Sequence, residues 1–367
     1  MQKTPRCLAF DLGKVIFDFD YTVALERIKN DITVPIEKVL DEVFMNNCFL
    51  DFEKGLVSDK EFYAQFIRTF GSSISYGRFV DIWSDIFTPK QEIITLLGRL
   101  RLLYPLYLVS NINELHYEHL YRKHPDVFGL FNGLLLSYQL KSLKPEEKFY
   151  AHLKKVSGCE YREIVYVDDR KDLIDAAQKL NLACILFQDF TTLLEGLVQA
   201  GIEIPTGAEA NTLTRLRNTL SGAKRPLIVG IGNTMRADDG AGAVIAATLV
   251  GAINITVINA GASIENYLGK IDHYNPDCVI IVDAAEFQEH ERFALYDVGM
   301  LQNISLHLTH DSSLKLALTY LQNIKPSDIL ILTIRPKTFT LGAPMSADVH
   351  TTVEILNTFF LNNFRLS

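Results

Sequence analysis

The sequence predicts an α/β protein built as two tandem three-layer α/β/α domains. Short apolar runs alternate with longer amphipathic stretches, the pattern of a mostly parallel sheet covered by helices. This alternation weakens near Gly196 and restarts near Pro226. The chain has 367 residues, and a domain usually takes roughly 100–200. We therefore expect a first domain at 1–200, a linker at 201–225 and a second domain at 226–367.

Four strands are predicted in the first domain. Each is an apolar run without alternation, as expected for a strand that is covered on both faces. The runs are residues 7–10, 106–109, 164–167 and 184–187. The long stretch between the first two runs is mainly helical in pattern, with Glu, Lys and Phe at helical spacing. We interpret residues 20–95 as a small helical cap inserted into a Rossmann-like domain.

Five strands are predicted in the second domain, which we expect to form a twisted sheet covered by helices. They are residues 226–231, 255–259, 278–283, 293–297 and 328–334. The segment before them holds the turn residues Pro205, Gly207 and Gly222 around a polar helical piece. This composition is the reason for placing the linker there.

Composition limits the partners and the compartment. The formal net charge of −8 argues against binding to nucleic acid or to an anionic membrane, which usually relies on clustered Lys and Arg. The five cysteines form no CxxC pair, so a zinc site or a disulfide framework is not expected, and free thiols suit a reducing cytoplasm. No segment has the roughly 18–20 consecutive apolar residues that a membrane span needs.

Polar residues at four places in the first domain form a candidate site. Asp11 ends the first predicted strand, Ser110 and Asn111 end the second, Lys144 precedes a proline, and Asp168 and Asp169 follow the third. Open α/β sheets bind ligands at the carboxyl ends of their strands. Singly, each residue is more often a turn or a helix cap, but all four places occur in order.

This set suits phosphoryl transfer. The Asp11 carboxylate can attack phosphorus and form an aspartyl-phosphate. Asp168 and Asp169 can join it in holding Mg²⁺, which prefers oxygen ligands. Ser110 and Lys144 can donate hydrogen bonds to the phosphate oxygens as charge develops in the transition state.

Residues 1–195 resemble the haloacid-dehalogenase-like (HAD) hydrolase superfamily, in its small sugar-phosphatase type with a short helical cap. The matching segments are Phe10-Asp11-Leu12-Gly13-Lys14-Val15-Ile16, Val109-Ser110-Asn111, Leu143-Lys144-Pro145, Val167 through Asp172 and, in the cap, Phe52-Glu53-Lys54-Gly55 with Ser58-Asp59-Lys60-Glu61-Phe62. The resemblance implies a small phosphorylated substrate, possibly a sugar phosphate. Most phosphatases of the superfamily have a second Asp two residues after the nucleophile as general acid and base. This chain has Gly13 there, which leaves the acid unassigned.

A second candidate nucleophile is Asp18. The segment Phe17-Asp18-Phe19-Asp20-Tyr21-Thr22 fits the superfamily's Asp-x-Asp-x-Thr pattern better when it is taken alone. Asp11 follows the better buried strand and keeps the subgroup's spacing to Ser110, so we favour Asp11. Asp18 is then expected in a flap hairpin.

The second domain carries a different constellation of acids. It opens with Gly230-Ile231-Gly232, but Met235 stands where a dinucleotide-binding loop needs glycine, and the two acids at Asp238 and Asp239 would repel a pyrophosphate. Acids suit a cation better. Asp239, Asp283 at the end of a strong apolar run, and His310 before a helix-like stretch would make a mixed nitrogen and oxygen site for nickel or zinc.

Residues 226–362 resemble the hydrogenase maturation endopeptidases, nearest to the group that serves the formate-hydrogenlyase hydrogenase. The matching segments are Gly230 through Asn233, Asp238-Asp239-Gly240-Ala241-Gly242, Ile281-Val282-Asp283-Ala284 and Thr309-His310. The resemblance implies a phosphorylase/hydrolase-like fold and a NiFe hydrogenase large-subunit precursor as partner. Asp239, Asp283 and His310 match the family's nickel-contacting residues. Asn259 stands where the family often has an acid, and Asp238 is expected to be a turn acid.

Together these features predict a bifunctional hydrolase: a Mg²⁺-dependent phosphatase and an endopeptidase directed by the Ni²⁺ of its precursor substrate. The alternative is that one half, more readily the HAD-like half, no longer turns over and serves as a docking or regulatory module. Gly13 and Asn259 keep this alternative open. A nucleotide-binding redox protein is disfavoured by the incomplete glycine pattern.

Overall fold

A computed structural model describes residues 5–35, 39, 47–287, 290–298, 307–308, 314, 317–321 and 328–366. The chain divides into two compact units, Met1–Glu203 and Ile204–Ser367. Each unit has a largely parallel sheet with helices against it, so the predicted α/β class is confirmed. Among the described residues, no helix is long and apolar enough to cross a membrane.

The first unit is built on a five-stranded parallel sheet. Its order is β5 (Gly133–Leu136), β4 (Leu106–Ser110), β1 (Cys7–Phe10), β6 (Ile164–Asp168) and β7 (Ala183–Leu186). Every residue of the central strand β1 is buried. The four strands predicted here are present within a residue or so, whereas β5 was not foreseen because its Gly133-Leu-Leu-Leu run is short.

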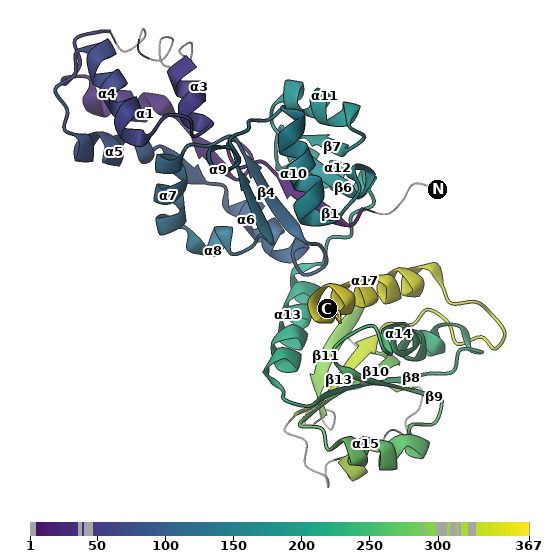
Figure 1. Ribbon diagram of the computed structural model, residues 1–367. Helices are drawn as coiled ribbons and strands as arrows, with labels where there is room; N and C mark the ends of the chain where they lie inside the picture. The colour runs from purple at the N-terminus through teal and green to yellow at the C-terminus, as the bar shows by residue number, and fades with distance from the viewer. Residues whose placement is uncertain are drawn as a thin grey trace. The chain divides into compact units, whose positions relative to one another are not determined.

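Helices cover this sheet and position its loops (Figure 1). α10 (Glu147–Ser157) and α11 (Lys171–Lys179) pack on one face through Phe149, Tyr150, Leu153, Ile174 and Ala177. The remaining helices are α6 (Gln91–Leu100), α7 (Glu114–Lys123), α8 (Pro125–Phe128), α9 (Ser137–Leu140) and α12 (Phe190–Gln199). Because β1 lies between β4 and β6 and is parallel to both, the carboxyl ends of these three strands lie together at one edge of the sheet.

The predicted cap is a group of helices with its own aromatic core. It contains α1 (Tyr21–Ile28), α3 (Asn47–Glu53), α4 (Asp59–Phe70) and α5 (Tyr76–Ser84). Its buried side chains include Phe49, Phe52, Phe62, Phe66, Phe70, Phe79 and Trp83. α4 begins in a capping box between Ser58 and Glu61 and ends at Gly71 in the left-handed conformation, as such sequences favour. An antiparallel ribbon of β2 (Phe17–Phe19) and β3 (Phe87–Pro89) joins the cap's ends.

The second unit has a mixed sheet that Figure 1 shows between two helical layers. The order is β11 (Phe293–Asp297), β13 (Asp328–Ile334), β10 (Cys278–Glu286), β8 (Pro226–Ile231) and β9 (Thr256–Gly261), with β12 (His307–Leu308) paired to β10. β11 and β12 are antiparallel to their partners, and the other pairs are parallel. α14 (Ala241–Leu249) and α17 (Ala347–Phe364) lie on one face, and α15 (Leu268–Tyr274) lies on the other. The five predicted strands are all present.

The expected linker at 201–225 differs from the structure. Most of it is the helix α13 (Gly207–Gly222), which begins in a capping box between Thr206 and Glu209. Buried Glu209 forms a two-point ion pair with Arg292, 2.9 Å from Nε to Oε1 and 2.9 Å from Nη2 to Oε2. Arg215 donates a hydrogen bond to Leu295 O. The polar surface of this helix, which suggested a solvated linker, is thus used to bind it to the second unit.

Candidate functional sites

Asp11, the predicted nucleophile, lies directly after β1 and is fixed by its backbone. Its amide donates to Val167 O at 2.9 Å, which holds it beside the end of β6. Lys144 Nζ lies 2.7 Å from Asp11 Oδ1 and 2.7 Å from Asp168 Oδ2, and it also donates to Val109 O. All three charged side chains are almost completely buried. The structure therefore brings Asp11, Lys144 and Asp168 into one ionic cluster.

Ser110 and Asn111 end β4 beside this cluster. Ser110 is buried. Asn111 exchanges two hydrogen bonds with the backbone of Lys144: its Nδ2 donates to Lys144 O at 3.0 Å, and its Oδ1 accepts from Lys144 N at 2.8 Å. Asn111 thus positions the lysine, a role that its place in the sequence did not reveal.

Asp168 is held on both oxygens. Oδ2 accepts from Lys144 and from the hydroxyl of Tyr166, and Oδ1 accepts from the amide of Arg170 at 2.9 Å. Tyr166 was not identified from the sequence, although it precedes Asp168 by two residues on the same strand. That period of two places both side chains on the same face of the sheet.

The residues present fit a divalent cation. Oxygens of Asp11, Asp168 and Asp169 lie within 4.8 Å of one another. Hard oxygen donors of this kind suit Mg²⁺. Three carboxylates and the Lys144 ammonium leave two negative charges, which one such cation balances. Burial raises the pKa of Asp11 to about 7, against the lowering effect of Lys144, and burial also raises the pKa of Asp169, so a bound cation would favour their ionised forms.

Asp18, the alternative nucleophile, lies away from this cluster. It is on β2, its side chain is 55% exposed, and it pairs with Lys14 at 2.5 Å. β2 pairs with β3, so Asp18 lies in a flap formed by two segments distant in sequence and not in the expected hairpin. The neighbouring Gly13 is covered by the same flap, because a Cβ there would lie 2.8 Å from Cε1 of Phe19.

The acids that lie after strand β8 and within strand β10 of the second unit are buried. Asp239 is 2% exposed, and its Oδ2 accepts from the amide of Asn233 at 3.1 Å. Asp283 is fully buried in β10, one residue beyond the pairing of Val282 with Gly230. Gly230 and Gly242 allow α14 to approach β8 and β10 closely, because a Cβ on either would overlap a backbone oxygen. The expected third ligand, His310, lies outside the described residues.

Asp238 is a structural acid, as its sequence context indicated. Its carboxylate accepts hydrogen bonds from the amides of Lys337, Thr338 and Ser346 and from the Ser346 hydroxyl, at 2.7–3.0 Å. It therefore ties the 337–346 loop to the turn that carries Asp239. Asn259 also has a structural role, because its Nδ2 donates a hydrogen bond to Ala243 O of α14 at 3.1 Å.

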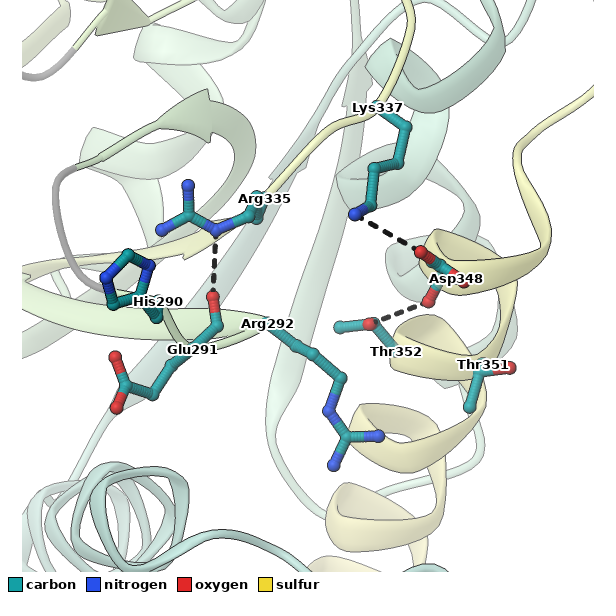
Figure 2. Close-up of a pocket in the computed structure, with 8 residues that line it drawn as sticks. All are labelled: His290, Glu291, Arg292, Arg335, Lys337, Asp348, Thr351 and Thr352. Carbon is teal, nitrogen blue, oxygen red and sulfur yellow. Dashed lines mark hydrogen bonds and ion pairs between the residues drawn. The ribbon is translucent and has the colours of Figure 1, made fainter.

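A cavity of about 220 Å³ opens where β13 ends (Figure 2). It is lined by His290, Glu291, Arg292, Arg335, Lys337, Asp348, Thr351 and Thr352. Arg335 follows β13, where Thr333 pairs with Asp283, so the cavity lies at the same end of the sheet as that acid. Arg335 Nε donates to Glu291 O, whereas its buried Nη2 has no hydrogen-bond partner among the described residues. Sequence reasoning did not identify this cavity.

Comparisons with known proteins relate the two halves to different hydrolases. The N-terminal half is similar to a D-ribitol-5-phosphate phosphatase of Bacteroides thetaiotaomicron, with 26% identity over 180 residues, which are 47% of this chain and 87% of that protein. A solved structure of a HAD family enzyme from the same organism is 26% identical, covers 52% of this chain and 99% of its own, and has a TM-score of 0.49.

The C-terminal half matches the family model described as HycI, hydrogenase maturation protease, over residues 245–362. A solved NiFe hydrogenase maturation protease from Thermococcus kodakarensis is 29% identical, covers 40% of this chain and 98% of its own, and has a TM-score of 0.36. Both resemblances inferred from the sequence are thus confirmed. Homologues on both halves are hydrolases, which confirms the predicted enzyme class.

Proposed function

We propose that the chain is a bifunctional hydrolase whose N-terminal half is a Mg²⁺-dependent phosphatase of small phosphorylated substrates. The observation that carries this proposal is the buried cluster in which Lys144 bridges Asp11 and Asp168. A nucleophilic carboxylate, a cation-binding acid and a fixed ammonium are the groups that phosphoryl transfer requires at one point. The relative named a ribitol phosphate phosphatase makes polyol and sugar phosphates the first substrates to test.

In this mechanism Asp11 attacks phosphorus and forms an aspartyl-phosphate, which water then hydrolyses. Lys144 stays protonated, because Asp11 and Asp168 raise its pKa by more than burial lowers it, and it donates to a phosphate oxygen. Ser110 donates to a second oxygen, and Asn111 keeps the lysine in place. Asp11, Asp168 and Asp169 would hold Mg²⁺, which would neutralise the charge of the phosphate when bound.

The phosphatase proposal is tested with p-nitrophenyl phosphate and with a panel of sugar and polyol phosphates in the presence of Mg²⁺. Wild type should release phosphate, Asp11→Asn should not, and chelation of the cation should stop the reaction. Asp18→Asn serves as the matched variant and should retain activity. If wild type and Asp11→Asn are equally inert, the N-terminal half is better explained as a docking or regulatory module.

For the C-terminal half, we propose an endopeptidase that trims the C-terminus of a NiFe hydrogenase large-subunit precursor. The support is the family match together with the burial of Asp239 and Asp283 at one end of the sheet. These carboxylates and His310 would recognise Ni²⁺ already present in the substrate. Cleavage near that ion would use it to polarise the peptide carbonyl or to activate water. We expect both reactions to take place in the cytoplasm, a reducing compartment.

The peptidase proposal is tested by incubating the nickel-loaded precursor with the full chain and measuring its mass. Wild type should shorten the precursor, whereas Asp239→Asn and His310→Ala should leave it intact. Glu354→Gln on the exposed face of α17 is the control and should behave as wild type. A precursor that keeps its full mass with wild type would contradict the proposal.

A further inference from the structure

The phosphatase reaction needs a proton donor that the residues discussed so far do not provide. Breaking the ester bond of an alkyl phosphate leaves an alkoxide, which must take up a proton, and the attacking water must later lose one. Gly13 has no side chain for this, and the flap residue Phe19 occupies the space above it. Both oxygens of Asp168 already accept hydrogen bonds, and Asp11 and Asp169 belong to the cation cluster.

Among the described residues, Glu53 is a further carboxyl group in the electrostatic field of this cluster. It is the last residue of the cap helix α3 and is partly buried. Beyond burial, the charges of Arg170, Asp11 and Lys144 act on its carboxyl, and two of these three residues are members of the cluster. Within the described part of the chain, its side chain makes no hydrogen bond and no ion pair, so the carboxyl is available to a substrate.

The backbone around Glu53 is fixed against the loops that carry the site. Ser137 Oγ donates to Glu53 O at 2.6 Å and accepts from the amide of Ile112 at 2.9 Å, two residues after Ser110. Lys54 pairs with Glu146 at 2.6 Å, two residues after Lys144.

The next residue completes this attachment. Gly55 has a φ of +68° and lies so close to Tyr138 O that no Cβ would fit, and Lys141 Nζ donates to its carbonyl. Three consecutive cap residues are therefore anchored on the core. Such anchoring limits the positions that the Glu53 side chain can take, as accurate proton transfer requires.

We propose that Glu53 is the general acid and base of the phosphatase site, supplied by the cap in place of a side chain at position 13. In the first step Asp11 attacks phosphorus, the bond from phosphorus to the ester oxygen breaks, and that oxygen takes the Glu53 proton to leave as an alcohol. In the second step water attacks the phosphoryl group and gives a proton to Glu53. The bond from Asp11 to phosphorus breaks, and phosphate is released.

The protonation state of Glu53 agrees with this role. Withdrawal from bulk water raises the pKa of Glu53 to about 8, Arg170 opposes this, Asp11 adds to it and Lys144 lowers it. Burial, and after it the charge of Glu53, raises the pKa of the Tyr21 phenol on α1. A carboxyl with this pKa is protonated at neutral pH and can serve as an acid before it serves as a base.

The test compares a substrate that needs a proton on its leaving group with one that does not. Glu53→Gln should lower kcat/KM by about 10²–10⁴-fold on the polyol or sugar phosphate that wild type uses best, with D-ribitol 5-phosphate in the panel. With p-nitrophenyl phosphate, the first turnover should still release one p-nitrophenolate per site. Steady turnover should then slow as the aspartyl-phosphate accumulates, because the base that activates water is missing. Glu26→Gln, an exposed cap acid, is the control.

Two further readouts separate a chemical role from a structural one. In wild type, kcat/KM on the polyol phosphate should fall as pH rises through about 8, and Glu53→Gln should lose this alkaline limb. Formate should restore part of the activity of Glu53→Ala, which also guards against a variant that is merely misfolded. Equal losses on both substrates without a burst, or no loss at all, would overturn the role of Glu53.

This inference rests on the proposed phosphatase function, but the two can fail separately. If wild type shows no Asp11-dependent turnover, the phosphatase proposal itself fails. If wild type is active and Glu53→Gln matches it on every substrate, only the assignment of Glu53 is wrong.

Discussion

The acids at the strand ends of the two units are buried in different ways. In the first unit Asp11 and Asp168 share the ammonium of Lys144, so opposite charges meet in the interior. In the second unit Asp238 is held by three amides and a hydroxyl, and Asp239 accepts from the amide of Asn233. The first arrangement presents a fixed positive charge to an anionic substrate. The second uses hydrogen bonds from the backbone to shape a loop.

The largest effect should come from removing the shared charge of the first unit. Lys144→Met leaves two carboxylates buried together, and breaking a buried ion pair on one side costs about 3–5 kcal/mol. Trp83, the only tryptophan of the chain, lies in the first unit, so its emission during urea unfolding measures this loss. Lys154→Met removes an exposed pair with Glu160 and should cost about 1 kcal/mol or less. Similar losses for both variants would contradict a special role for the buried cluster.

The second unit should be most sensitive where backbones touch. Gly242→Ala in α14 would place a methyl group against the carbonyl oxygens of Val282 and Ile231, and overpacking of this kind costs about 1–3 kcal/mol. Hydrogen exchange of the β8 and β10 amides measures the loss. The matched variant is Gly269→Ala in α15, where a Cβ meets open space. That variant should be neutral or should stabilise the unit by up to about 1 kcal/mol.

The role of Asp238 gives a third test. Asp238→Ala leaves several loop donors without their acceptor, which should cost about 2 kcal/mol and should speed hydrogen exchange in the 337–346 loop. Asp348→Ala is the control, because its pair with Lys337 at 3.2 Å is exposed and should contribute about 1 kcal/mol at most. If the loop exchanges equally fast in both variants, the hydrogen bonds of Asp238 do not hold it.

Strands could be predicted from the sequence because their apolar pattern is local. Contacts between residues distant in sequence could not. The runs that form β1, β4, β6 and β8 are apolar along their length, so their strands were predicted closely. Buried parallel strands have this pattern because both faces are covered. The carboxyl ends of such strands meet at one edge, and for that reason Asp11, Lys144 and Asp168 could be expected together before any contact was known.

The contacts of residues whose partners are distant in sequence could not be predicted in this way. Glu209 looked like part of a polar linker because its partner Arg292 is 83 positions away. Glu53 lies in a segment that matched the superfamily, but the attachment of its backbone at Ser137 joins residues 84 positions apart. The role of Asn111 depends on its hydrogen bonds to the backbone of Lys144, in a loop 33 positions away. Spacing along the chain does not encode these contacts.

The smallest expected effect concerns Gly13, the counterpart of Gly242 in the first unit. Both glycines lack room for a Cβ, but the obstacle at Gly13 is the ring of Phe19 on the flap and not a carbonyl oxygen of the sheet. A side chain on a two-stranded ribbon can move more easily than the backbone of a buried strand. Gly13→Ala should therefore cost about 1 kcal/mol or less by Trp83 emission, with the ring displaced. A loss as large as that of Gly242→Ala would show that the flap is packed as rigidly as the core, and Phe19 would then be a fixed wall of the phosphatase site.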